Sequence, residues 1–128
     1  MINTVSLRAL SIAMALTIAT SASCWAGEKR ITASEASSYI GQSATVCGNV
    51  ASTKYAYRSK GQPTFLNLDE PYPRQIFTVL VWGKDRPAFG APETTYAGKS
   101  ICVTGAIKNY RGKPEIIVRT PSQITSAN

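Results

Sequence analysis

Apolar and polar residues alternate along most of the chain beyond residue 42, and a period of two residues predicts strands. In the segment 43–53, Val46, Gly48 and Val50 share one face and Cys47 lies on the other. A glycine inside a strand is typical of a bulge or a sharp bend, which we expect at Gly48. Four further segments have strand character, at 64–69, 76–83, 99–107 and 113–120.

A short helix is predicted ahead of the first of these strands. Thr32 and Glu35 have the spacing of a capping box, in which the hydroxyl and the carboxylate bind backbone N–H groups at the start of a helix. Ile40 ends this helix, and Gly41 follows as a stop signal.

The connection between the third and fourth strands cannot itself be a strand, because it contains Pro87 and Pro92. Asp85 can begin a short helix near Pro87, and the apolar pattern favours core positions for Phe89 and Trp82, with Trp82 facing a ligand as the alternative.

This pattern predicts an all-β fold: a five-stranded Greek-key barrel with a short N-terminal helix and a short helix or loop between strands three and four. A second type of five-stranded small barrel stays open as an alternative, although its connections are usually shorter. No internal repeat or linker divides the chain, so we expect one domain over residues 27–128.

Residues 1–26 have the layout of a secretory signal peptide. Arg8 precedes an apolar run over 9–19, and small residues lead to an expected cleavage after Ala26. The run is shorter than the roughly 20 residues that a membrane-spanning helix needs, so we expect no stable membrane span. Lipoprotein processing at Cys24 stays as an alternative. We therefore expect the protein to be periplasmic or secreted.

Charge and cysteine content fit an exported binding domain. Without the leader and its Arg8, 13 basic residues face 7 acidic ones, a net charge of +6. This excess favours polyanionic partners, although it can also serve only to keep the protein soluble. Removal of the leader leaves two cysteines, Cys47 and Cys102, and an oxidising compartment favours a disulfide between them.

The sequence predicts a protein that is not an enzyme and has no cofactor. The chain has no histidine, so a catalytic triad is excluded and a zinc site is not expected. The adjacent carboxylates Asp69 and Glu70 fall in a turn, which a solvated strand end explains better than metal binding. Gly112 and Lys113 lack the upstream glycines of a phosphate-binding loop.

Cations and tyrosines concentrate in the turns. The stretch "IKNYRGKPEIIV", 107–118, has the form of a β-hairpin with a basic tip. The turn between the first two strands has the same chemistry, and the turn "EPYPRQ" adds a third element. The candidate binding residues are Lys54, Tyr55, Tyr57, Arg58, Lys60, Tyr72, Arg74, Lys108, Tyr110, Arg111 and Lys113.

The chain resembles the OB-fold, in the branch of anticodon-binding and single-strand-binding domains, and more closely small exported bacterial OB proteins. The segments "ATVCGNV", "PTFLNLDEPYPRQIFTVLVWG" and "AGKSICVTGAIKNYRGKPEIIV" carry the resemblance. In that fold strands one and four are antiparallel neighbours, which implies a cross-strand disulfide between Cys47 and Cys102; two buried thiols are the alternative. The resemblance also implies that the loops of strands one–two and four–five converge beside an aromatic face.

We therefore expect a monomer that binds single-stranded nucleic acid, with DNA favoured over RNA, because cations neutralise phosphates and tyrosines stack on bases. One alternative is a protein- or glycan-interaction module of the cell envelope that uses the same face, and another is an accessory to a nuclease. Phe65 is either a core residue or a stacking platform. The third strand is apolar on both faces, so alternation does not orient it.

Overall fold

The computed structural model describes residues 29–127, so the expected leader and Cys24 lie outside the described residues. Seven strands form the fold: β1 (Arg30–Thr32), β2 (Ser43–Tyr55), β3 (Thr64–Leu68), β4 (Phe77–Val81), β5 (Ser100–Tyr110), β6 (Lys113–Ile117) and β7 (Ile124–Ser126). The helical elements are η1 (Ala33–Tyr39), η2 (Arg86–Ala88), η3 (Pro121–Gln123) and the α-helix α1 (Pro92–Thr95). The structure is therefore mainly β, as the sequence predicts.

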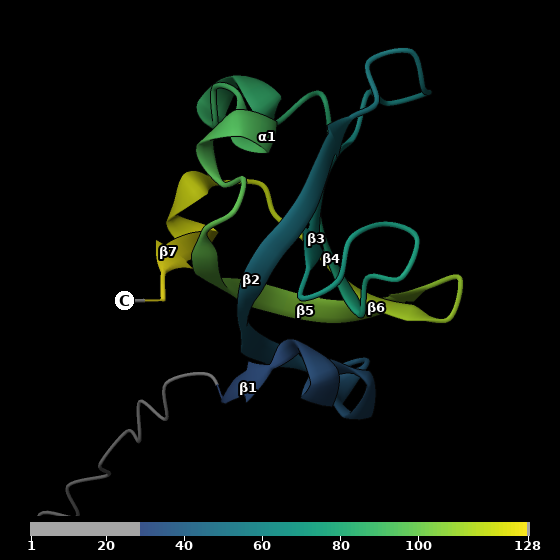
Figure 1. The fold of residues 1–128 in the computed structure, drawn as a ribbon, viewed down its shortest axis with the longest axis vertical. Helices are drawn as coiled ribbons and strands as arrows, with labels where there is room; N and C mark the ends of the chain where they lie inside the picture. The colour runs from purple at the N-terminus through teal and green to yellow at the C-terminus, as the bar shows by residue number, and fades with distance from the viewer. Residues whose placement is uncertain (1–28, 128) are drawn as a thin grey trace, which may run out of the picture.

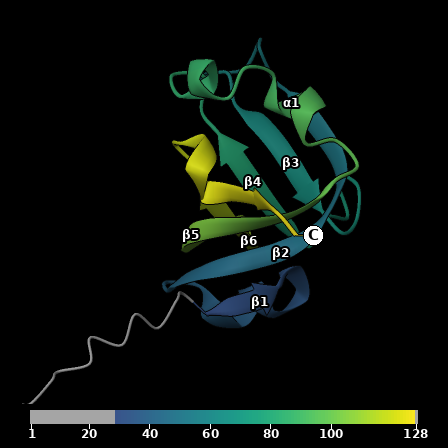
Figure 2. The same cartoon turned by 90° about the vertical axis from the view of Figure 1, so that its left-hand side faces the viewer.

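The strands pair in a ring (Figures 1 and 2). β2 pairs with β3, β3 with β4, β4 in parallel with β6, β6 with β5, and β5 again with β2. These five strands correspond to the five predicted ones. The prediction of five strands is nevertheless incomplete, because β1 adds in parallel to β2 and β7 adds to β5, so the sheet has seven strands.

The long strands β2 and β5 each belong to both halves of the sheet. The first half of β2 pairs with β1 and β5, and its second half pairs with β3. The register shifts between Val50 and Ser52, so the bulge lies there and not at Gly48, which pairs regularly with Ile101. A Cβ atom at Gly48 would lie 2.8 Å from the carboxylate of Asp69, so the glycine allows the Asp69 side chain to approach the backbone of β2 closely.

The core is built from rows of apolar residues that cross the strands. One row crosses the first half-sheet and consists of Ile31, Val46, Val103 and Ile124. A second crosses the other half-sheet and consists of Leu66, Val79, Ile116 and Ile107. Val79 and its neighbours Phe77 and Val81 point inward, which settles the orientation of β4.

The short helices follow the sequence signals in part. The capping box is confirmed: the Glu35 N–H donates to Thr32 Oγ1 at 3.3 Å, and the Thr32 N–H donates to Glu35 Oε1 at 3.2 Å. The helix near Pro87 is confirmed as η2, and Phe89 is buried behind it. Trp82 is half-buried and lies outside the core cluster, contrary to expectation, and its ring packs against Gly61.

The disulfide between Cys47 and Cys102 is confirmed, and it joins directly opposed residues of β2 and β5. The neighbouring pairs on the same face are also linked. Thr45 and Thr104 share a hydrogen bond of 2.7 Å between their hydroxyls, and the Ser100 hydroxyl donates to Asn49 Oδ1. Three successive side-chain links therefore close this strand pair on the side away from the core.

Within residues 29–127, no helix has both the length and the apolar character needed to cross a membrane.

Candidate functional site

Two rows of side chains cross the face of β2, β3, β4, β6 and the end of β5 that points away from the core; we call this the outward face. The first, the apolar row, consists of Phe65, Leu80 and Ile117, with Lys54 beside Phe65 at its β2 end. The second, the polar row, consists of Ser52, Asn67, Thr78, Glu115 and Lys108. The pairing register sets each row, because directly opposed residues point to the same side of a sheet.

The outward face resolves the position of Phe65. Its neighbours along β3, Leu66 and Leu68, are fully buried in the core, so Phe65 points to the other side and is only half-buried. Leu80 lies beside it in the apolar row and is also outside the core cluster. Phe65 is therefore placed as an outward ring and not as a core residue.

Hydrogen bonds join the polar row to the β3–β4 loop. The Tyr72 N–H and Asn67 Nδ2 both donate to the Ser52 hydroxyl at 3.0 Å. The Thr78 hydroxyl donates to Asn67 Oδ1 at 3.4 Å. This chain of contacts fixes the loop above the sheet and uses polar groups that would otherwise be buried without partners.

Glu115 is the buried carboxylate of the polar row, with only 6% of its surface exposed. Burial raises the pKa of Glu115, since a charged carboxylate is poorly solvated there, while the nearby Lys108 ammonium lowers it. Lys108 is the residue directly opposite on β5. A buried acid beside a basic turn is unusual where a residue only stabilises the fold. Glu115 is therefore a candidate functional residue of the outward face.

The β5–β6 turn is tight and presents a tyrosine and an arginine. Arg111 and Gly112, its two central residues, both have positive φ, at 50° and 84°, as a type I′ hairpin turn requires. The Gly112 N–H donates to Asn109 Oδ1 at 2.8 Å. The Arg111 guanidinium lies 5.3 Å from the centre of the Tyr110 ring, so the cation and the ring lie side by side at the exposed turn.

The β3–β4 loop lies against this turn. Lys113 Nζ donates to the Pro73 carbonyl at 2.6 Å, and the Tyr72–Pro73 peptide is cis. Tyr72 is 72% exposed. Between the loop and the turn is a groove of about 240 Å³, with Thr78 and Glu115 at its floor. The predicted residues Tyr72, Tyr110, Arg111 and Lys113 all line this one groove, and Arg74 follows in the exposed loop.

The β2–β3 loop carries the other predicted cluster. Tyr57 is 55% exposed, and the Arg58 guanidinium lies 5.3 Å from the centre of its ring. Lys60 is exposed on the same loop. Trp82 supports the loop from β4, because its ring packs against Gly61 and the Gly83 N–H donates to the Gly61 carbonyl at 2.9 Å.

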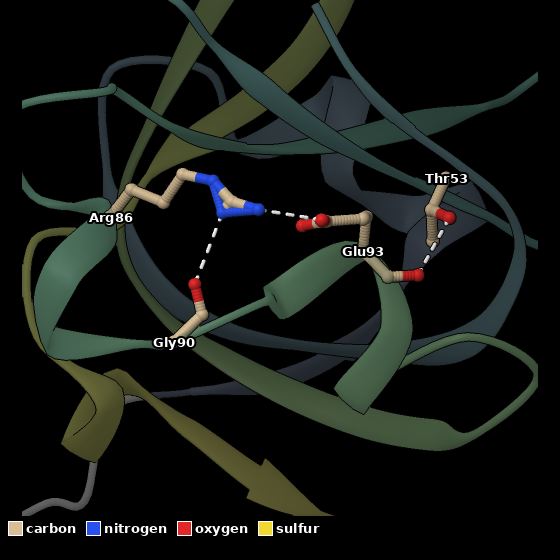
Figure 3. A network of polar contacts seen from close by, with 4 residues as sticks. All are labelled: Thr53, Arg86, Gly90 and Glu93. Carbon is tan, nitrogen blue, oxygen red and sulfur yellow. Dashed lines mark hydrogen bonds and ion pairs between the residues drawn. The ribbon is translucent and has the colours of Figure 1, made fainter. Parts of the chain in front are cut away.

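Tyr55 is not an open stacking surface. The Arg86 guanidinium covers its ring at 3.7 Å from the ring centre. Arg86 is itself held by Glu93 Oε1 at 2.6 Å and by the Gly90 carbonyl at 3.0 Å, as Figure 3 shows. The Thr53 hydroxyl donates to the Glu93 carbonyl at 2.8 Å, which ties this network back to β2.

The two basic loops do not converge as expected. Thr64 pairs with Val81 at one end of the β3–β4 hairpin, next to the β2–β3 loop. β6 runs parallel to β4, with Thr78 opposite Glu115, so the β5–β6 turn lies at the other end, beside the β3–β4 loop. In Figure 1 both loops project to the right of the ribbon, one at the top and one lower. They mark the two ends of the outward face.

Sequence reasoning missed the polar row apart from Lys108, and it missed Gln75, which lines the groove. Ser52, Asn67 and Thr78 look like ordinary strand residues, and only the register places them together. Glu115 gave a signal that could have been used, since it is a lone carboxylate within an apolar strand. No cluster of acidic, histidine or cysteine side chains suited to a metal ion occurs in the described part of the chain.

Neither a known protein family nor a curated protein sequence matches the chain. A solved structure with a TM-score above 0.5 shares the fold. A chain described as an aspartyl-tRNA synthetase of Leishmania major Friedlin superposes with a TM-score of 0.52 at 13% identity, over 84% of this chain and 22% of that one. An aspartyl-tRNA synthetase of Entamoeba histolytica gives a TM-score of 0.47 at 19% identity, over 75% and 21%. The chain thus spans about a fifth of the length of these proteins.

Proposed function

We propose that this protein is an exported OB-fold domain that binds single-stranded nucleic acid, DNA in preference to RNA, across the outward face. The pairing of five strands, with β2 also paired to β5, supports the proposed Greek-key barrel, to which β1 and β7 would be additions. The fold is shared with part of a protein whose name gives tRNA as its substrate. The proposed setting is the periplasm or the exterior, after removal of residues 1–26, with the domain as a monomer.

One observation carries the proposal: exposed tyrosines stand beside cations at both ends of the outward face. Tyr57 with Arg58 marks one end, and Tyr110 with Arg111 marks the other. Phe65 lies between the ends in the apolar row. Rings of this kind stack on bases without regard to sequence, and the cations neutralise backbone phosphates.

The proposed role is binding without catalysis. The Ser52 hydroxyl is engaged in holding the β3–β4 loop, because it accepts a hydrogen bond from the Tyr72 N–H. Glu115 is a single buried acid, and paired acid–base chemistry would need a second titrating group in hydrogen-bond reach. An accessory role beside a separate nuclease is compatible with this assignment.

The test is a salt titration of oligonucleotide binding. We expect wild-type affinity for a dT decamer to fall steeply with salt, because each neutralised phosphate of a single strand contributes about −0.7 to the log–log slope. Tyr110→Ala should weaken binding by roughly 5- to 150-fold, the equivalent of one stacked base at about 1–3 kcal/mol. Arg111→Gln should reduce the slope by about 0.7.

The matched control is Lys99→Gln, which removes one positive charge from an exposed residue just before β5. It should leave the slope almost unchanged if the outward face binds the strand. No binding at low salt would contradict the proposal. An equal effect of Lys99→Gln and Arg111→Gln would show only general attraction to a basic protein. Binding of an acidic glycan with unchanged affinity in Tyr110→Ala would favour the envelope-interaction alternative.

A further inference from the structure

The groove between the β3–β4 loop and the β5–β6 turn has the size of a site for one planar ring. Its volume is about 240 Å³, below the roughly 300–1,000 Å³ of pockets for drug-sized ligands. Tyr72 contributes to the wall from the loop, and Tyr110 contributes to the wall from the turn. Both rings are more than half exposed, so each can contact a ring that enters.

Two residues that line the groove, Gln75 and Glu115, carry oxygens that can accept hydrogen bonds. Gln75 Oε1 is buried and accepts no hydrogen bond from any residue of the range 29–127. Glu115 contributes a carboxylate from the floor. A buried acceptor without a partner is costly, and proteins keep few of them, so the Gln75 oxygen points to a ligand donor.

The cations around the groove are placed differently from one another. Lys113 donates to the Pro73 carbonyl and so closes one side of the groove. Lys108 stands opposite Glu115 in the strand register. Arg111 lines the groove from the tip of the turn, where it can donate to an acceptor on the far side of an entering ring. The groove therefore offers acceptors at its floor and a donor at its mouth.

We propose that this groove binds one base of the strand and selects guanine; the inference rests on the proposed function. The pairing edge of guanine carries a ring N–H next to an amino group; the amino group matches Gln75 Oε1, and the ring N–H matches Glu115. The remaining O6 and N7 atoms are acceptors, which suit Arg111. Adenine and cytosine place a ring acceptor beside their amino group, so one contact with the floor is repulsive.

The experiment compares hexamers of dT in which one central position is dG, 2′-deoxyinosine, dA or dC, with binding followed by fluorescence anisotropy. Deoxyinosine differs from dG only in lacking the amino group. We expect wild type to bind the dG hexamer roughly tenfold more tightly than the deoxyinosine hexamer, the usual effect of one good base contact. Gln75→Met should lose this ratio, because Gln75 is assigned to the amino group. Glu115→Gln faces the ring N–H, which deoxyinosine keeps, so it should weaken the dG and deoxyinosine hexamers alike. Both variants should still bind an all-dT hexamer.

The control is Gln42→Met, the same substitution at an exposed glutamine ahead of β2, which should keep the ratio. Unfolding curves show whether each variant is folded. If wild type binds all hexamers equally, the guanine inference is overturned and the proposed function stands. If wild type binds none of them at low salt, both fail. If Gln75→Met keeps the full ratio, the assignment of Gln75 to the amino group is wrong.

Discussion

The guanidinium carbon of Arg86 lies 3.7 Å from the centre of the Tyr55 ring and couples the connection between β4 and β5 to the end of β2. Arg86 also forms an ion pair with Glu93 in α1. A ring predicted to stack on a base is thus occupied by a neighbouring part of the same chain. The cluster holds the end of β2, where the β2–β3 loop begins, and Tyr57 is the exposed ring of that end.

Loss of Arg86 should destabilise the fold more than it weakens nucleic-acid binding. Arg86→Met keeps the aliphatic stem and leaves Glu93 partly buried without its partner, so we expect a loss of about 1–3 kcal/mol in the free energy of unfolding. Urea denaturation measures this. In the Glu93→Gln background the same substitution should cost less, because the buried charge is gone. Equal costs in the two backgrounds would exclude coupling between the pair.

Reduction of the disulfide should strongly destabilise the domain. Cys47 and Cys102 are separated by 55 positions, and the loop-entropy relation gives about 4 kcal/mol for a closed loop of that length. We expect the urea midpoint to fall when a reductant is added to wild type and to be insensitive to it in a Cys47→Ala, Cys102→Ala double variant. A wild-type midpoint that does not move with reductant would contradict this, provided that thiol counting shows full reduction.

Glu115 should make wild-type stability depend on pH in a defined direction. Burial raises the pKa of Glu115 in the folded protein above its ordinary value of 4.5. The folded state therefore retains a proton that the unfolded chain has released, and the free energy of unfolding falls as pH rises from about 4.5 through the higher folded pKa. The Lys108 ammonium, opposite in register, lowers the pKa of Glu115 and partly offsets the effect of burial.

The measurement compares wild type with Glu115→Gln in urea from pH 4 to pH 7. The variant has no such titration, so its stability relative to wild type should increase with pH across this window. Glu35 acts in the opposite sense, because its hydrogen bonds with Thr32 lower its pKa. It is common to both proteins and cancels in the difference. A difference that stays constant over the range would rule out the proposed effect of burial.

Gly48→Ala should destabilise the fold through Asp69. The added Cβ would lie 2.8 Å from Asp69 Oδ1, which accepts the hydrogen bond from the Asn49 N–H at 2.9 Å. We expect a loss of about 1–3 kcal/mol, from overpacking and the lost hydrogen bond. In an Asp69→Gly background, where the backbone already needs a positive φ of 67°, the same change should cost clearly less. Thermal or urea unfolding of the four proteins decides this.

Local signals in the sequence predicted local structure well. The capping box of Thr32 and Glu35 and the β-hairpin over 107–118 each depend on a few neighbouring residues, and both are confirmed. The disulfide followed from a resemblance that supplied the pairing of distant strands. The strands β1 and β7 were missed because three-residue segments have no readable period, and their partners are remote in the chain.

The candidate site was predicted less completely, because it depends on register and on packing between distant segments. Alternation could not orient β4, since Leu80 and Val79 are both apolar, and only the pairing with β3 and β6 separates them. Arg86 reaches Tyr55 from 31 positions along the chain, and no pattern indicates such a contact. The partnership of Lys113 with Pro73 likewise joins two turns that the sequence presents separately.

That last contact has a consequence for the thermodynamics of binding. The Lys113 ammonium holds the β3–β4 loop against the β5–β6 turn in the absence of any ligand. A strand that enters the groove then meets walls already in place, and little conformational freedom is lost in ordering them. Binding in this groove should weaken when the groove walls are loosened, and also when the contacts between the walls and the strand are removed. Lys113→Met would therefore weaken binding mainly through entropy, a loss visible by calorimetry even at salt concentrations that screen its charge.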